Sequence, residues 1–215
     1  FLVEDCISLP LRPRLAVALG APAELHGGGH PSLRMALRMP AHGTNLRSIG
    51  VRLPAVLDLD SSDLQELCSR RRAKQGRCPQ DARIGTASAR TPLLAGPMHG
   101  GLYVVQPEDE GPPDIWASIS GQGLEINLPA QTKVHGGRTE TRFLDLPDFP
   151  LRSLVLRLRS GEGGILELKR RPCGPLHAPT RVSGQNRARV SLRPRIVAKG
   201  KHCGGLDSHT FGTNR

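Results

Sequence analysis

Apolar side chains recur at every second position along many short segments of this chain, and that period constrains its fold more than any other feature. A period of two matches the β-strand, in which successive side chains point to opposite faces of a sheet. Arginines fill several of the intervening positions, so we expect them on the solvent face. The clearest cases are Leu33, Met35 and Leu37, which alternate with Arg34 and Arg38, and Leu154, Leu156 and Leu158, which alternate with Val155, Arg157 and Arg159.

Turn-forming residues separate these segments. The 215 residues include 25 glycines and 19 prolines, which fall roughly every eight to twelve residues, the spacing typical of β-sandwiches. Aromatic residues make up only 3% of the chain, so the core must come from Leu, Val, Ile and Ala. No apolar run approaches the roughly 18 residues that a membrane-spanning helix needs. We therefore predict an all-β fold of antiparallel, Ig-like β-sandwiches.

The order of the segments indicates an internal repeat. NLRSIGVRLP (45–54) is similar to PLRSLVLRLR (150–159), and Leu46 and Leu151 lie equally far ahead of Cys68 and Cys173. Further similar segments keep the same order at an offset of about 105 residues, the signature of a duplication. We predict two tandem sandwich domains, 1–100 and 101–200, followed by a tail over 201–215.

Two histidines are each followed by glycines, in HGGGH (26–30) and HGG (135–137). We interpret both as turns that open the strand that follows. The alternative for His26 and His30 is a metal site, but their spacing of four suits a helix and the three intervening glycines disfavour one. We expect no metal and no cofactor.

One segment predicts a helix. In 60–74, Ser62 is a candidate N-cap, and Gln65 three residues later completes a capping box. We therefore expect one short helix near 61–73. Arg70, Arg71 and Arg72 at its end suit the negative pole of the helix dipole, although they are also a candidate contact for a polyanion.

The five cysteines form no pattern that is typical of a zinc site. Cys68 and Cys78 enclose a short loop, and we predict a disulfide between them. We predict a second disulfide between Cys173 and Cys203, which leaves Cys6 unpaired or bonded elsewhere. Such bonds imply an oxidising compartment, whereas the alternative is five free thiols in a cytosolic protein.

The chain is strongly basic, with a formal net charge of +11 and 25 Arg against 5 Lys. Arginine can recognise phosphate through its planar guanidinium group. A GC-rich genome produces the same enrichment together with Ala, Gly and Pro, and we favour that interpretation. The arginines would then lie on solvent-facing sides of the strands, where they also discourage edge-to-edge aggregation.

Motifs of common enzyme classes are missing from the sequence, including the serine-hydrolase elbow, the HExxH metalloprotease motif, the P-loop and the dinucleotide fingerprint. We therefore expect a protein that is not an enzyme. Nucleic-acid binding fits the charge, but binders of single strands stack bases on aromatic residues. Here only Trp116, Tyr103 and four Phe are present.

The segment CPQDARIGTASARTPLLAGPMHGGLYVVQ (78–106) resembles the repeat signature of exported multi-repeat proteins of high-GC bacteria, and TPLL (91–94) is its most specific part. The resemblance covers most of 6–195, but the paired glycines before LYVV depart from the single glycine of that family. It implies a large secreted or envelope protein and no particular activity. Other segments similar to the signature are 28–37, 45–54, 144–158 and 184–186.

Together these features predict a non-catalytic structural or adhesive module of a secreted or cell-surface assembly, such as a filament. Its expected partners are other copies of itself, neighbouring repeats of a longer chain, or an anionic envelope polymer. The alternative function is a basic module that binds a polyanion such as nucleic acid.

Overall fold

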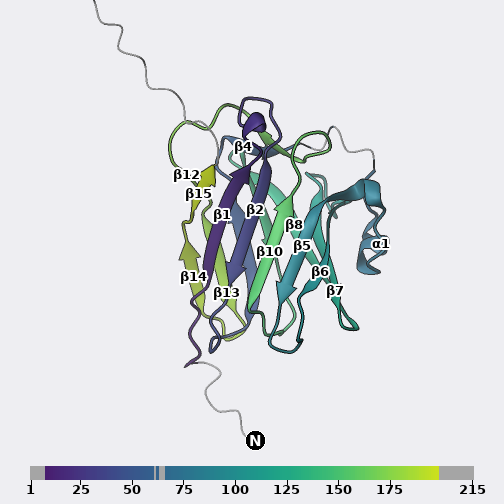
Figure 1. Cartoon of the computed structure of the whole chain (residues 1–215), viewed down its shortest axis with the longest axis vertical. Coiled ribbons are helices and arrows are strands. Elements are labelled where there is room, and N and C mark those ends of the chain that lie inside the picture. Colours follow the sequence, from purple (N-terminus) through teal and green to yellow (C-terminus); the bar gives the residue numbers. More distant parts are fainter. Residues whose placement is uncertain (1–7, 61, 63–65, 199–215) are drawn as a thin grey trace, which may run out of the picture.

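The computed structural model describes residues 8–60, 62 and 66–198, and β-strands dominate it (Figure 1). One α-helix, α1 (Arg70–Lys74), and two 3₁₀ turns, at Pro22–Glu24 and Gln80–Ala82, complete the regular structure. The strands are β1 (Arg14–Gly20), β2 (Ser32–Arg38), β3 (Leu46–Arg52), β4 (Leu57–Leu59), β5 (Arg83–Arg90), β6 (Met98–Val105), β7 (Asp114–Gly121), β8 (Leu124–His135), β9 (Arg138–Phe143), β10 (Ser153–Leu158), β11 (Leu166–Leu168), β12 (Leu176–His177), β13 (Thr180–Gly184), β14 (Arg189–Leu192) and β15 (Arg195–Ala198).

Thirteen of these strands form one continuous sheet in the order β12-β15-β1-β2-β10-β5-β6-β7-β8-β9-β3-β13-β14, and β4 pairs with β11 in a small second sheet. Neighbouring strands are antiparallel except β1 and β15, which are parallel. The strands β1, β2, β10 and β5 run side by side across the middle of Figure 1.

The long sheet curls until two stretches of it face one another. We call β1, β2, β10 and β5 the first layer, and β9, β3, β13 and β14 the second layer. Leu33 and Leu158 of the first layer line the same apolar cavity as Val51 and Phe143 of the second, so the inner sides of the layers meet there. The alternation read from the sequence is confirmed here, because Leu33 and Leu158 are buried while Arg34 and Arg157 are exposed.

The predicted division into domains 1–100 and 101–200 is not what the structure shows. β10, from the second half of the chain, lies between β2 and β5 of the first half. Buried residues of both halves belong to one hydrophobic cluster, so the described chain has one core rather than two. The strand period predicted the β-sheet correctly, but it carried no information about which strands pair. The predicted tail over 201–215 lies outside the described residues.

The segments that suggested the repeat nevertheless occupy matching places in the sheet. β3 lies between β9 and β13, and β10 lies between β2 and β5. In the strand order across the sheet, one stretch is β1-β2-β10-β5-β6 and a later stretch is β8-β9-β3-β13-β14. Each half of the chain thus supplies four strands of one stretch and the central strand of the other.

The helix is shorter than predicted and begins later. Ser69, not Ser62, is its N-cap, and the Ser69 hydroxyl accepts a hydrogen bond from the Arg72 backbone N–H at 3.4 Å. Cys68 lies outside the helix, because its N–H donates to Val104 O within β6 and its C=O accepts from the N–H of Gln106 just after β6. The proposed partner of Ser62, Gln65, lies outside the described residues.

The predicted disulfide between Cys68 and Cys78 is confirmed, with Cα atoms 5.3 Å apart. It ties the strand-like segment before α1 to the segment that leads into β5. Cys173 is also disulfide-bonded. Its predicted partner Cys203 lies outside the described residues, as does Cys6.

The histidine-glycine segments are turns, as predicted. Gly136 and Gly137 connect β8 to β9 with φ angles of +57° and +68°, which suit a two-residue hairpin turn of type I′. Gly28, with φ +74°, belongs to the turn that precedes β2. This turn is held by backbone hydrogen bonds from Gly28 to Leu168 and from Leu168 to Gly29.

Candidate anion-binding groove

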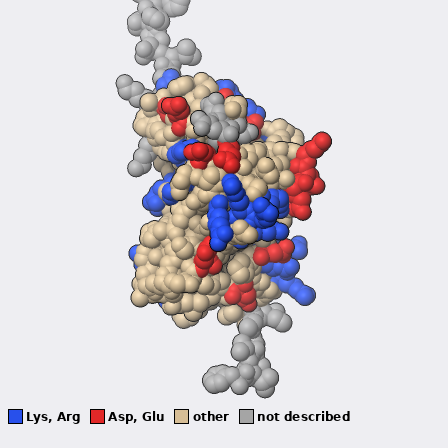
Figure 2. All heavy atoms as spheres, turned by 90° about the vertical axis from the view of Figure 1, so that its right-hand side faces the viewer, with Lys and Arg blue, Asp and Glu red and all other residues tan. Residues whose placement is uncertain are grey.

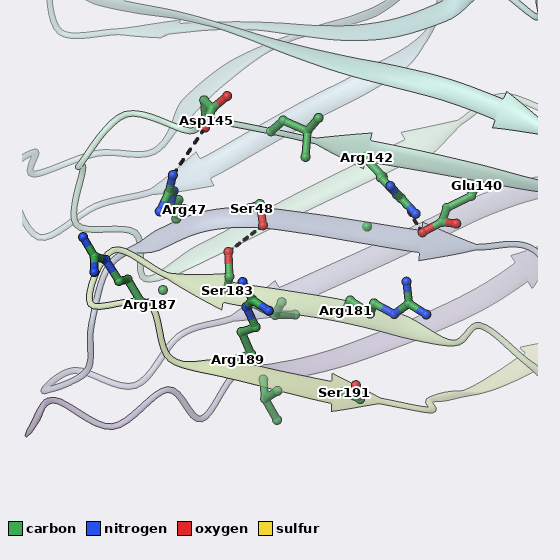
Figure 3. A pocket seen from close by; sticks show the side chains of 15 residues that line it. Arg47, Ser48, Glu140, Arg142, Asp145, Arg181, Ser183, Arg187, Arg189 and Ser191 are labelled. Carbon is green, nitrogen blue, oxygen red and sulfur yellow. Dashed lines mark hydrogen bonds and ion pairs between the residues drawn. The ribbon is translucent and has the colours of Figure 1, made fainter. Parts of the chain in front are cut away.

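A groove of about 750 Å³ lies on the outer side of the second layer (Figure 3). We call it the arginine groove, because five arginines and only two carboxylates line it, a formal charge of +3. Its charged residues are Arg47, Arg142, Arg181, Arg187, Arg189, Glu140 and Asp145.

Strand register creates the groove. Arg142, Gly50, Arg181 and Ser191 are directly paired across β9, β3, β13 and β14, so they form one row on the outer side. Gly50 leaves a gap in that row. A side chain at Gly50 would meet Cγ of Arg142 at 3.1 Å, and it would fill the floor between the two arginines.

One end of the groove is electrostatically satisfied. The Glu140 side chain is only 4% exposed, and it accepts hydrogen bonds from Arg142 Nε at 2.8 Å and from an Arg52 terminal nitrogen at 3.1 Å. The hydrogen bond from Arg142 is the main cause that lowers the pKa of Glu140, against the opposing effect of burial, and Arg52 adds to it. The same bond raises the pKa of Arg142.

This arrangement predicts an acid-sensitive contribution to stability. Because the folded pKa of Glu140 lies below its ordinary value of 4.5, the contribution is complete above about that pH and is lost as pH falls through the folded pKa. Glu140→Gln is expected to lower the free energy of unfolding by about 1 to 2 kcal/mol at pH 7. Urea denaturation at pH 7 and pH 3 measures it. The deficit should shrink at pH 3, and a constant deficit would contradict this origin.

The other end of the groove holds unsatisfied positive charge. Arg181, Arg187 and Arg189 make no ion pair with any residue that the structure describes, and Arg47 approaches Asp145 only to 4.0 Å at a largely exposed site. In Figure 3 these side chains come from β3, from β13 and β14, and from the turn between the last two.

The turn that carries Arg187 is fixed by its neighbours. The Gln185 backbone N–H donates to Asn45 O at 2.9 Å, and the Gln185 side-chain amide donates to Leu146 O at 3.0 Å. These contacts hold the hairpin so that Arg187 keeps a left-handed φ of +66°. Nearby, the Ser48 and Ser183 hydroxyls share a hydrogen bond of 2.6 Å, which places two polar groups on the floor.

The sequence singled out other arginines. Arg70 donates hydrogen bonds to Asp114 at 2.9 Å and to Glu108 at 3.2 Å, and it lies over Trp116 at 5.6 Å. Arg72 is 3.6 Å from Glu66. Only Arg71 of the predicted polyanion contact makes no ion pair within the described ranges. Figure 2 faces the side with α1, and it shows acidic side chains around a central group of basic ones.

The arginine groove was missed because its residues are far apart in sequence. The segment 180–190 did contain a local signal. Arg187 and Arg189 lie two positions apart, just after a Gln-Asn turn, so a strand would place both on the same face. What joins them to Arg142 and Arg47 is the pairing of β3 with β9 and β13, which no local pattern encodes.

Other features of the described chain give no comparable site. An acidic pocket around Glu108, Asp109 and Glu110 is partly neutralised by Arg70, and no group of His, Cys, Asp and Glu among the described residues could hold a metal ion. Two small apolar cavities lie between the layers. In the part of the chain that the structure describes, no helix has the length and apolar character to cross a bilayer.

Comparison with known proteins does not assign the groove. No family model matches the chain, and no curated protein matches it. A solved DUF4466 family protein from Parabacteroides merdae is similar at a TM-score of 0.33 and 11% sequence identity, over 86% of this chain and 44% of that chain. The chain thus spans less than half the length of that protein. The chain described here is all-β and is built on one large curled sheet.

Proposed function

We propose that this protein is a non-catalytic structural or adhesive module that holds a linear anionic polymer in the arginine groove. The observation that carries the proposal is the group formed by Arg181, Arg187 and Arg189, which share one groove and have no carboxylate partner among the described residues. Unpaired like charges repel one another, so a bound anion would stabilise them.

The layout suits a polymer better than a single small anion. Arg142 and Arg181 are two strands apart, which is roughly 10 Å across a sheet, and they flank the bare backbone of Gly50. Guanidinium groups bind phosphate, sulfate or carboxylate groups through paired hydrogen bonds. Ser48, Ser183 and Ser191 add hydroxyls that can bond to uncharged parts of the polymer.

A glycan-type or polyphosphate-type polymer is favoured over nucleic acid. The groove lining contains no Phe, Tyr or Trp on which a base could stack. The disulfide between Cys68 and Cys78 supports a role outside the reducing cytosol, in a secreted or cell-surface assembly where copies of the chain contact one another. The alternative remains a polyanion-binding module whose partner is nucleic acid.

Binding of dextran sulfate tests the proposal. The triple variant Arg181→Ser, Arg187→Ser, Arg189→Ser is expected to bind about 30-fold more weakly at moderate salt. Its plot of log affinity against log salt should be shallower by about 2 to 3, because fewer counterions are released. Fluorescence anisotropy with labelled polymer measures both quantities.

A matched control removes the same charge elsewhere. Arg77, Arg170 and Arg171 are exposed, lie outside the groove and make no ion pair with described residues. If the triple serine variant at these positions weakens binding as much as the groove variant, the affinity reflects net charge and the proposed site is wrong. Tighter binding of a single-stranded oligonucleotide of equal charge would instead favour the alternative.

A further inference from the structure

We infer that the protein carries a second polyanion site on the opposite side, so that one molecule bridges two polymer strands. The inference rests on the proposed function of the arginine groove and extends it from holding one polymer to cross-linking two. The second site is the outer side of the first layer, which we call the arginine face. Its arginines are Arg14, Arg34, Arg38, Arg90 and Arg157.

These arginines are exposed and unneutralised. None of the five guanidinium groups makes an ion pair with any residue in the described ranges. The four strands that carry them, β1, β2, β10 and β5, contain no Asp or Glu at all. The positive charge of this face is therefore not offset by carboxylates of its own strands.

Like charges are paired directly across the strands. Arg34 is opposite Arg157, and Arg14 is opposite Arg38. Such pairs destabilise a sheet when no anion lies between them. A polymer that places a negative group at each pair would convert two repulsive contacts into attractive ones.

In the second layer, the arginine at the equivalent position is neutralised by a carboxylate of the neighbouring strand. Alignment of the two Leu-Arg-Ser segments makes Arg52 of β3 the counterpart of Arg157 of β10. Arg52 is opposite Glu140 and bonds to it at 3.1 Å, whereas Arg157 is opposite Arg34. Arg34 thus stands where the matching layer has a carboxylate, which leaves this face dependent on an external anion.

Small side chains line the surface between these arginines. Ala16, Ala18 and Ala36 point to the same side as Arg34 and Arg38, because Val17, Leu33 and Leu37 are buried on the other side of their strands. Small side chains let a polymer approach the sheet while the long arginine side chains reach around it. On this side β1 and β2 carry no large aromatic or aliphatic side chain, and β10 adds only Val155, beside Ala36.

The two sites point in opposite directions. The inner sides of β2 and β10 share one apolar cavity with the inner sides of β3 and β9, so their outer sides face away from each other. Packed sheets lie roughly 10 Å apart, and the arginines extend farther on each side. A stiff polymer bound at one site is therefore not placed to fill the other, which leaves the second site for another strand.

A bridging assay tests this inference. Dextran sulfate chains too short to reach both sides of one molecule are fixed to beads, the protein is bound to saturation, and fluorescent dextran sulfate of the same length is added after washing. The native protein and the variant at Arg77, Arg170 and Arg171 should recruit the fluorescent polymer. The groove variant and the face variant (Arg34→Ser, Arg38→Ser, Arg157→Ser) should each still bind the beads through the remaining site, at a protein concentration raised to saturate that site, and should recruit at least ten-fold less.

A charge-reversal variant guards against misfolding. Arg34→Glu would place a carboxylate opposite Arg157, as Glu140 is opposite Arg52, so the sheet should keep its urea midpoint while recruitment falls. If either face variant recruits as much fluorescent polymer as the native protein, the inference is wrong. That outcome includes the case in which two protein molecules associate with each other and bridge the two polymers through their two grooves. Bead binding by the native protein without recruitment would also overturn it, yet leave the proposed function intact. Failure to bind the beads at all would overturn the proposed function itself.

Discussion

Arg70→Ala is expected to lower the free energy of unfolding by about 3 kcal/mol. Asp114, whose side chain is 6% exposed, accepts a hydrogen bond from Arg70 at 2.9 Å. Its other oxygen accepts from the Thr132 backbone N–H at 3.0 Å. Without Arg70 this carboxylate stays buried at the start of β7, against β8, with no counter-charge, which costs more than the loss of an exposed ion pair.

Arg71→Ala is the matched control. The two residues are adjacent in α1 and carry the same charge, but Arg71 is exposed and makes no ion pair within the described ranges. Its replacement should change stability by less than about 0.5 kcal/mol. Urea denaturation followed by Trp116 fluorescence suits this comparison, because Arg70 lies over that indole ring. Equal effects of the two substitutions would refute the structural role of Arg70.

Phe143→Ala is expected to cost about 4 kcal/mol. Phe143 lines both apolar cavities between the layers, of about 40 and 70 Å³. Truncation would join these cavities into one larger void, and the cost of a buried truncation grows with the volume left behind. The curled sheet is held by strand pairing on both sides, so it has little freedom to collapse into that space.

Thermal and urea denaturation measure this effect, and Phe143→Leu is its control. Leucine keeps most of the volume, so its cost should stay below about 1.5 kcal/mol. A joined apolar cavity should also bind xenon or benzene, which would raise the stability of the alanine variant but not that of the native protein. Similar losses for alanine and leucine would show that the cavities do not determine the cost.

The strand period determined much of what was predictable. Leu33, Leu37, Leu154 and Leu158 are buried as predicted. Their alternation is a local property of a strand with one side against a core, so a single sequence is enough to show it. The disulfide between Cys68 and Cys78 was also accessible, because both cysteines border one short loop.

The topology was not accessible for a physical reason. β10 pairs with residues of β2 that are more than a hundred positions away and with residues of β5 that are more than sixty positions away. A strand with one apolar face can pack equally well beside several other strands, so its pattern does not select these neighbours. The similar segments indicated two matching units. Because the segments of each unit follow one another along the chain, the sequence favoured two tandem domains. The helix was predicted too long, because the pairing of Cys68 with β6 outweighs the helix propensity of the preceding residues.

The candidate site depended on that same topology. Charge and the two-residue alternation of the sequence indicated that arginines would face solvent. They did not indicate that Arg181 and Arg142 would flank Gly50. The sequence also could not show that Arg70 is neutralised by Asp114, which is 44 residues away. Local clustering therefore selected the arginines of α1, whereas the two groups of arginines without ion pairs that we propose as sites lie on two surfaces of the sheet.

Each stretch of the sheet takes its central strand, β10 or β3, from the other half of the chain, and this has a consequence for biosynthesis. When a ribosome has completed β6, the nascent chain contains β2 and β5 but not β10, which separates them in the finished sheet. At ordinary translation rates β10 follows roughly 3 to 10 seconds later. Two unpaired strand edges with apolar inner sides stay open for that time, a configuration prone to aggregation. Chaperone protection of the emerging polypeptide would cover this interval.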